Sequence, residues 1–277
     1  MKICNILVNN EIHPAVVTER GVIDAAASGL TIDEIIAGAD RTPFEKLAAD
    51  TSLPVVENPV YGNVVDRTGK LICVGLNYRQ HAINTNMPIP EYPILFSKFA
   101  NALVPAGTEV ELPEWEDSYD YEAELVIVMG KSAWGVSEEE AKDYIFGYTC
   151  GNDFSCRDPQ MRSGQWLIGK TMPGFGPCGP CIVTADEFDP DKPHFIQSYV
   201  NGEKRQDSDV TDVIFSAAQV VSYASKYMRL EPGDLIYTGT PSGVALEGTV
   251  NKFGWLKKGD TVEVRIEGIG SLINKMK

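Results

Sequence analysis

Two glutamates lie one residue apart at the start of an apolar segment, and they constrain the chain more than any other feature. Glu122 and Glu124 precede residues 125–128, which are leucine, valine and isoleucine. Such a run predicts a buried β-strand, in which residues i and i+2 point to one face about 6.6 Å apart. Carboxylates on a buried strand are costly unless a cation meets them. The pair therefore indicates a metal site or, alternatively, a solvated strand start.

A third carboxylate, Asp153, follows an aromatic stretch further along the chain. Three carboxylates with no histidine or thiolate among them suit a hard divalent cation, Mg²⁺ or Mn²⁺, better than zinc. Glu122, Glu124 and Asp153 are therefore candidate ligands for such an ion.

Composition excludes several classes of function. The chain has 277 residues, 43% of them hydrophobic and 23% charged, which is typical of a globular protein with a large core. A net charge of −15 argues against binding to nucleic acid or to an anionic membrane surface. The N-terminal residues lack the long apolar stretch of a signal peptide. The six cysteines are expected to be reduced core residues, and together these features predict a cytoplasmic protein.

The spacing of apolar segments and turns predicts two units. Residues 1–66 resemble a small N-terminal α+β domain, with strands at 3–8 and 15–17 and a helix capped by Thr31. Residues 67–277 alternate short apolar segments with turns, so we predict a β-rich domain, a roll or sandwich closed on itself. Its expected strands are 71–74, 125–128, 181–184, 197–200, 235–237 and 261–266, and its expected helices are 138–144 and 213–226.

Two short motifs match known sites without the required context. Residues 164–171 fit the phosphate-loop pattern, but the loop interior is bulky and Pro173 opposes a following helix. Cys178 and Cys181 have the spacing of a thioredoxin-type pair, yet they come between a turn and a predicted strand. We interpret both as coincidences, which leaves an NTPase and a thiol oxidoreductase as minor alternatives.

His81 is the histidine whose position favours catalysis. It follows an apolar strand and precedes a loop rich in proline and methionine, and loops after strand ends often carry function. A serine nucleophile has no support, because the chain contains no G-x-S-x-G motif.

From about residue 70 to its end, the chain closely resembles the fumarylacetoacetate hydrolase superfamily. Seven blocks occur in the family's order, which is more specific than any one of them. They are Gly75 to Tyr78 with His81, Pro93 to Lys98, Tyr121 to Leu125, Asn152 to Asp158, Gln165-Trp166 with Gly169-Lys170, Asn201 to Gln206, and Gly239 to Val244.

The resemblance implies an α+β, β-rich fold, a mixed β-sandwich roll that is usually dimeric. It also implies a divalent metal, Mg²⁺ or Mn²⁺, held by the three carboxylates. Lys170 and His81 match the family's catalytic positions. The residues that match positions around the bound acid are Arg157, Gln160, Gln206 and Thr240.

Enzymes of this family act on small 2-oxo or β-dicarbonyl acids. The leading expectation is a metal-dependent hydrolase that cleaves a C–C bond in an acylpyruvate. The alternatives are an oxaloacetate-type decarboxylase, an isomerase or hydratase, and a metal-containing 2-oxo acid binding protein. The residue chemistry agrees, because a metal ion can stabilise a developing enolate and Lys170 adds fixed positive charge beside it.

The chain departs from the family pattern at two positions. Hydrolytic members usually carry a glutamate three residues after the loop histidine, where this chain has Asn84, and they often have an aspartate where it has Pro173. Asparagine cannot neutralise an imidazolium, so water activation is expected to be weaker unless another acid, such as Glu91, substitutes. From the sequence alone, we predict that Asn84→Glu raises hydrolysis.

Overall fold

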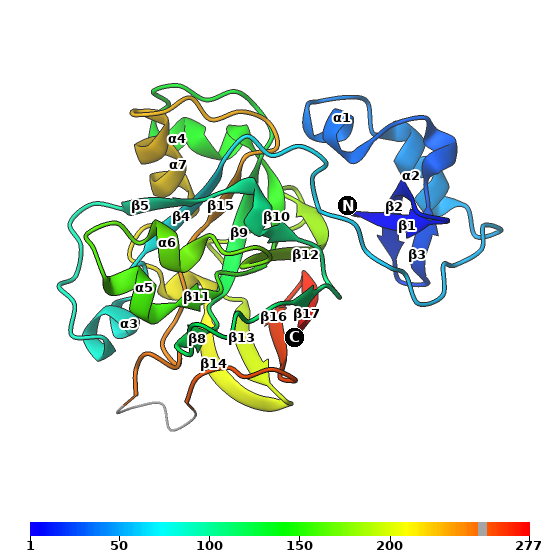
Figure 1. Cartoon of the computed structure of the whole chain (residues 1–277). Helices are drawn as coiled ribbons and strands as arrows, with labels where there is room; N and C mark the ends of the chain where they lie inside the picture. The colour runs from blue at the N-terminus through cyan, green and yellow to red at the C-terminus, as the bar shows by residue number, and fades with distance from the viewer. Residues whose placement is uncertain (249–253) are drawn as a thin grey trace.

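A large mixed sheet forms the centre of the protein, as the computed structural model of residues 1–248 and 254–277 shows (Figure 1). Within these residues it has ten strands in the order β3-β2-β1-β12-β10-β9-β15-β4-β5, and β6 pairs with β12. The strands are β1 (Lys2–Val8), β2 (Glu11–Thr18), β3 (Gly21–Asp24), β4 (Leu71–Gly75), β5 (Ile94–Lys98), β6 (Leu103–Val104), β9 (Ala123–Met129), β10 (Ile145–Asn152), β12 (Gly176–Thr184) and β15 (Leu235–Tyr237).

A smaller sheet packs against the large one. Side chains of both sheets, including Ile127 on the large sheet and Ile196 and Val264 on the smaller one, share one hydrophobic core. The β-rich α+β sandwich roll expected from the sequence is therefore confirmed. The smaller sheet has the order β14 (Glu203–Asp209), β13 (Phe195–Val200), β16 (Thr261–Ile266), β17 (Gly270–Met276) and β7 (Glu109–Val110), and a separate pair joins β8 (Tyr119–Asp120) to β11 (Ser155–Cys156).

Short helices connect the strands (Figure 1). In the part of the chain that is described, no helix is long and apolar enough to cross a membrane. The α-helices are α1 (Ile32–Ile36), α2 (Thr42–Ala49), α3 (Arg79–Asn84), α4 (Glu138–Ala141), α5 (Arg157–Met161), α6 (Leu167–Lys170) and α7 (Ala217–Ser225), and the 3₁₀ helices are η1 (Ala26–Ser28), η2 (Ala100–Ala102), η3 (Lys142–Tyr144) and η4 (Val210–Asp212).

The predicted helices form, but one of them begins later than expected. Thr31 and Glu34 make the capping box of α1, and the segment 138–144 is α4 continued by η3. The helix predicted from residue 213 begins at Ala217 because the Ser216 side chain accepts the N–H of Gln219 and fixes the helix start there.

Neither coincidental motif forms the site that its pattern suggested. Residues 164–171 contain the short helix α6 and not a glycine-rich loop between a strand and a long helix. Cys178 and Cys181 both lie on β12 and belong to different hydrophobic clusters. Burial raises the pKa of Cys178 to about 12, the opposite of what a redox thiol needs. All six cysteines are free and buried.

The N-terminal unit joins the large sheet at its edge. It forms a small lobe beside the rest of the chain (Figure 1), and β1 pairs antiparallel with β12 through Ile3 and Ile182. Ile3, Ile182 and Phe44 also share one hydrophobic cluster. The division into residues 1–66 and 67–277 stays a prediction.

Glycines allow the central strands to pack closely. A Cβ atom on Gly147 of β10 would lie 2.2 Å from the backbone oxygen of Val183 on β12. On Gly151 of the same strand, it would lie 2.4 Å from Val126 and 2.7 Å from the ring of Tyr237. Larger residues would therefore separate β10 from its neighbours, and β10 is the strand that leads to Asp153.

We predict that Gly147→Ala lowers the free energy of unfolding by about 1–3 kcal/mol, because the added methyl group meets backbone that cannot move aside. The matched control is Gly164→Ala, where nothing lies within 4 Å of the added atom, and its effect should stay within about 0.5 kcal/mol. Urea denaturation of both variants measures the difference. Equal stability of the two variants would contradict the close packing described here.

Candidate metal and catalytic site

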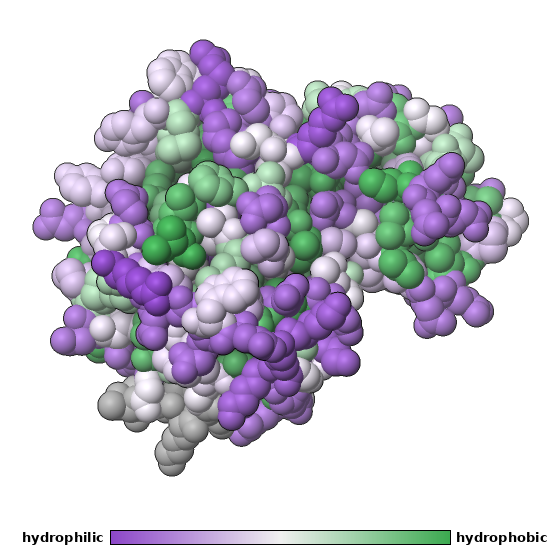
Figure 2. Space-filling model, viewed as in Figure 1, coloured by the Kyte–Doolittle hydropathy of each residue, from purple (hydrophilic) through white to green (hydrophobic). Residues whose placement is uncertain are grey.

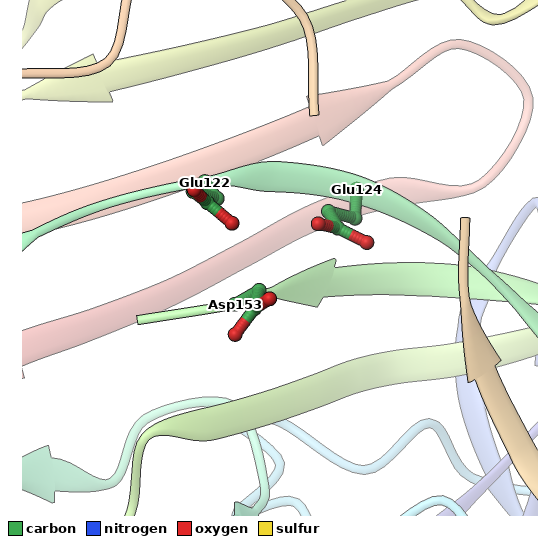
Figure 3. Close-up of side chains that lie close together, drawn as sticks. All are labelled: Glu122, Glu124 and Asp153. Carbon is green, nitrogen blue, oxygen red and sulfur yellow. The ribbon is translucent and has the colours of Figure 1, made fainter. Parts of the chain in front are cut away.

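The three carboxylates predicted as metal ligands lie together in the structure. Their ligand oxygens are all within 4.8 Å of one another, and all three residues are buried. Glu122 directly precedes β9, Glu124 is near the start of that strand, and Asp153 directly follows β10 (Figure 3). The two strands are in register at Glu124 and Gly151. The N–H of Asp153 donates to the carbonyl of Glu122 at 3.0 Å, which fixes the third acid beside the first.

The charge of this cluster fits a divalent cation. Burial and the negative charges of Asp153 and Glu122 raise the pKa of Glu124 well above its ordinary value. Burial opposes ionisation of Glu122 as well, but the cations of Lys170 and Arg157 hold its pKa below the ordinary value. The Glu124 carboxylate accepts the N–H of Gly239 at 2.7 Å. A hard cation with oxygen ligands would supply the positive charge that Glu124 lacks.

Two buried cations from neighbouring short helices contact the carboxylates. Lys170 Nζ on α6 lies 2.7 Å from Glu122 Oε2 and 2.9 Å from Asp153 Oδ2. Arg157 on α5 donates from Nη2 to Glu122 Oε1 at 2.6 Å and from Nη1 to Gln160 Oε1 at 3.0 Å. The structure thus brings Arg157, Gln160 and Lys170 to the carboxylate cluster.

Lys98, at the end of β5, is a third buried cation, and sequence reasoning assigned it no role. Its Nζ lies 2.5 Å from Asp153 Oδ1. It also donates to the carbonyls of Phe154 at 3.0 Å and Phe175 at 2.7 Å, and to that of Lys170. One side chain therefore holds both the segment with Asp153 and the segment with Lys170. The sequence block that ends in Lys98 matched the family, but nothing in that block indicated burial.

His81 on α3 has a carboxylate partner that sequence reasoning also missed. Its Nδ1 lies 2.7 Å from Glu247 Oε1, and both residues are buried. The other oxygen of Glu247 accepts from Asn84 Nδ2 at 3.0 Å and from Ser242 Oγ at 2.7 Å. Burial by itself would raise the pKa of Glu247, but these hydrogen bonds keep that pKa below its ordinary value. Glu91, the substitute considered from the sequence, lines a different surface pocket.

Asp120 connects the segment of Glu247 to the carboxylate cluster. This fully buried side chain accepts the N–H groups of Ala245 at 2.7 Å and Leu246 at 2.9 Å. It also accepts from Arg157 Nε at 2.8 Å. The segment that carries Glu247 is therefore tied to the same guanidinium that contacts Glu122.

A cavity of about 410 Å³ brings these groups together. Two of the carboxylates line it, as do both candidate catalytic side chains and three of the four predicted substrate-binding side chains. Gln206 does not line it. Its amide donates to Thr240 Oγ1 at 2.8 Å and accepts the N–H of Ala123 at 2.9 Å, so it lies behind Thr240. The predicted site residues on the cavity wall are His81, Glu122, Glu124, Arg157, Gln160, Lys170 and Thr240.

Comparison with known proteins relates this site to one family. The family model for the C-terminal domain of fumarylacetoacetate (FAA) hydrolase matches residues 70–277. The chain is 38% identical over 276 residues to 2,4-didehydro-3-deoxy-L-rhamnonate hydrolase of Sphingomonas sp. (strain SKA58), covering 98% of this chain and 94% of that protein. It is 38% identical over 267 residues to the mitochondrial oxaloacetate tautomerase FAHD2A of Bos taurus, covering 92% and 84%.

A solved structure with a bound metal is also similar. Fumarylpyruvate hydrolase from Pseudomonas aeruginosa, in complex with Mn²⁺ and pyruvate, is 35% identical, with a TM-score of 0.69. The match covers 81% of this chain and 98% of that one. Proteins of this group are thus named as hydrolases and tautomerases, and one of them holds a divalent metal.

We predict that Glu124→Gln abolishes metal-dependent stabilisation without destabilising the metal-free protein. Glutamine keeps the shape of the side chain but cannot carry a negative charge. In the metal-free protein that charge is repelled by Asp153 and Glu122, so its loss should not lower stability. Mg²⁺ or Mn²⁺ at 100 times its Kd should stabilise the wild-type protein by about 2.7 kcal/mol. Thermal denaturation with the metal and with EDTA measures both effects. A metal-dependent shift retained in the variant would exclude Glu124 as a ligand.

Proposed function

The chain belongs to the fumarylacetoacetate hydrolase family, and we propose that it is a divalent-metal-dependent hydrolase that cleaves a C–C bond in an acylpyruvate or a related β-diketo acid. The observation that carries this proposal is the pair formed by His81 and Glu247. It shares one cavity with Lys170 and two of the candidate metal ligands.

The buried charges suit the binding of a 2-oxo acid. When held by Glu122, Glu124 and Asp153, Mg²⁺ or Mn²⁺ would act as a Lewis acid toward the oxygens of the substrate. Lys170 holds positive charge at the same place, where negative charge develops on the substrate during C–C cleavage. Thr240 also lies at the cavity wall, where its hydroxyl donates to the carbonyl of Ala123 at 2.9 Å, so its backbone N–H is the group proposed to orient the acid.

His81 is proposed as the general base. With Nδ1 bonded to Glu247, Nε2 remains for a water molecule in the cavity that His81 lines. The imidazole takes a proton from this water as its oxygen attacks the acyl carbonyl, and Glu247 stabilises the imidazolium. The bond between the acyl carbonyl and the adjacent methylene then breaks. The acyl group leaves as a carboxylic acid, and the methylene carbon takes the proton to complete pyruvate.

Keto–enol tautomerisation of a 2-oxo acid is the second candidate. The same imidazole can take a proton from the carbon next to the oxo group and return it to the oxo oxygen, which gives the enol with no water added. The similarity to a protein named oxaloacetate tautomerase supports this alternative.

Turnover of acetylpyruvate and oxaloacetate, each with Mg²⁺, with Mn²⁺ and with EDTA, separates the reactions. Cleavage of acetylpyruvate supports the hydrolase, enol exchange alone supports the tautomerase, and loss of CO₂ from oxaloacetate alone supports a decarboxylase. Binding without turnover would support a binding protein.

We also propose a cytoplasmic homodimer with no nucleic-acid or membrane partner. Six free cysteines fit a reducing compartment. The net charge of −15 opposes contact with phosphate-rich surfaces. The homodimer rests on the family resemblance, and light scattering in solution tests it.

We predict that His81→Asn and Glu247→Gln each lower acylpyruvate hydrolysis by about 10²- to 10⁴-fold, because each removes part of the general base. Neither residue is a candidate metal ligand, so both variants should keep the metal-dependent thermal stabilisation of the wild type. Steady-state kinetics with acetylpyruvate measures the loss. If Glu247→Gln retained full activity, the pair would have no role in hydrolysis.

The hydrogen bonds of Asn84 lead us to expect the opposite effect for Asn84→Glu. The Asn84 amide donates to Glu247 and to Ser242, so a glutamate there would place a second carboxylate beside Glu247. Two neighbouring carboxylates repel each other, so the ionised form of Glu247, which would stabilise the imidazolium of His81, would become less favourable. We therefore expect Asn84→Glu to lower hydrolysis.

The double variant Asn84→Glu/Glu247→Gln is the matched test of this explanation. It leaves a single carboxylate at positions 84 and 247 together, so it should recover part of the activity lost in Glu247→Gln. Kinetics of the single and double variants with acetylpyruvate decide this point. A rise in activity in Asn84→Glu alone would restore the expectation drawn from the sequence.

A further inference from the structure

One wall of the cavity is apolar and firmly held. Trp166 packs edge-on against Phe96, with ring centroids 5.4 Å apart. On its other side it meets Gly75, where a Cβ atom would lie 2.4 Å from the indole ring. Trp166 is therefore held between Phe96 in the middle of β5 and Gly75 at the end of β4. Other apolar residues that line the cavity are Val74, Leu76, Met87, Met161 and Leu246.

The mouth of the cavity also exposes apolar side chains. Met161 on α5 is 54% exposed and Leu246 is 36% exposed, and both line the cavity. Ile168 on α6 is also exposed, although it does not line the cavity, and Figure 2 shows hydrophobic surface among polar surface in the region of α6. A hydrocarbon chain that extends from the cavity along these side chains would remove apolar surface from water.

The positive groups of the cavity are already paired with carboxylates. Among the lining residues that the structure describes, only Arg157, Lys170 and His81 can carry a positive charge. Arg157 contacts Asp120 and Glu122. Lys170 contacts Glu122 and Asp153.

Beyond these groups, a second anion would meet unfavourable surroundings. The pair of His81 places Glu247, a further carboxylate, on the cavity wall. Arg162, which is next to Met161 in the sequence, is bound to Glu116 and does not line the cavity. A carboxylate at the far end of a substrate would therefore lie against apolar side chains or near Glu247, with no described cation to pair with.

We propose that the cavity selects acylpyruvates whose acyl tail, beyond the second carbonyl, is an uncharged hydrocarbon, and that it rejects tails that end in a carboxylate. The specificity lies with Trp166, Met161 and Leu246. The inference deepens the proposed function, because it names the substrate class for the same site. For crotonylpyruvate, water adds to the acyl carbonyl, the C–C bond breaks, and crotonate and pyruvate are released.

Binding of two uncleavable 2-oxo acids tests the inference without catalysis. 2-Oxohexanoate ends in a methyl group where 2-oxoadipate ends in a carboxylate. Titration calorimetry with the Mn²⁺-loaded protein should show that 2-oxohexanoate binds at least about tenfold more tightly. Equal binding, or tighter binding of 2-oxoadipate, overturns the inference whatever reaction the protein catalyses.

Kinetics with a matched pair of acylpyruvates adds a separate readout. Crotonylpyruvate and fumarylpyruvate differ only by a methyl group in place of the terminal carboxylate. We expect kcat/KM for crotonylpyruvate to be at least about tenfold higher. If neither compound is cleaved but 2-oxohexanoate binds more tightly, the hydrolase proposal fails and the inference on the tail stands. A preference for fumarylpyruvate overturns the inference and leaves the hydrolase proposal intact.

A substitution at the mouth of the cavity provides the matched variants. Met161→Arg introduces a cation on an exposed position, so the fold should tolerate it. The ratio of kcat/KM for fumarylpyruvate to that for crotonylpyruvate should rise by about tenfold, and the ratio of the two 2-oxo acid affinities should move the same way. Met161→Gln, polar but uncharged, should not produce that rise. If the two variants behave alike, Met161 does not face the tail and the inference fails at this wall.

Discussion

The balance between buried carboxylates and buried cations is the constraint on which the rest of this structure depends. Glu122, Glu124 and Asp153 lie together where the central strands β9 and β10 begin and end. Such a group is unfavourable in an apolar core without positive charge. Lys170 and Lys98 supply part of that charge, and each contacts Asp153. The charge that remains unbalanced at Glu124 supports the proposal that the cluster holds a metal ion instead of forming a closed network of salt bridges.

The same contacts join segments that are far apart in the chain. Lys98 donates to the carbonyl groups of Phe154 and Phe175 as well as contacting Asp153. Asp120 also joins distant segments. It accepts hydrogen bonds from Arg157 and from the backbone N–H of Leu246, which is next to Glu247. Neither residue needs to touch substrate to matter. Each holds candidate catalytic groups from different elements at a fixed separation, and fixed separation is what acid–base catalysis requires.

Sequence patterns predicted the apolar strands well and the polar ones poorly. The segment 125–128 lies inside β9, which is buried along its whole length. In contrast, β14 consists of Glu203–Asp209 and carries almost no apolar residues. It forms because the neighbouring strand β13 offers an open edge for pairing. Gln206, on this polar strand, matched a substrate-binding position in the family, but its side chain is occupied by hydrogen bonds behind the cavity wall. The pattern of residues along the chain indicates neither the pairing of a polar strand with its neighbour nor the hydrogen bonds that hold the Gln206 side chain.

The sequence by itself indicated the candidate metal ligands and the family, because both are encoded locally. Glu122 and Glu124 share a face of their strand through the two-residue period of β structure, and ordered motif blocks identified the relatives. Only the tertiary structure brought together the pair that we propose for acid–base catalysis. His81 contacts Glu247, a residue 166 positions away. Asn84, which stands where the family usually has a glutamate, donates a hydrogen bond to this carboxylate. Contacts at such separation depend on how the strands are arranged, and no local spacing records them.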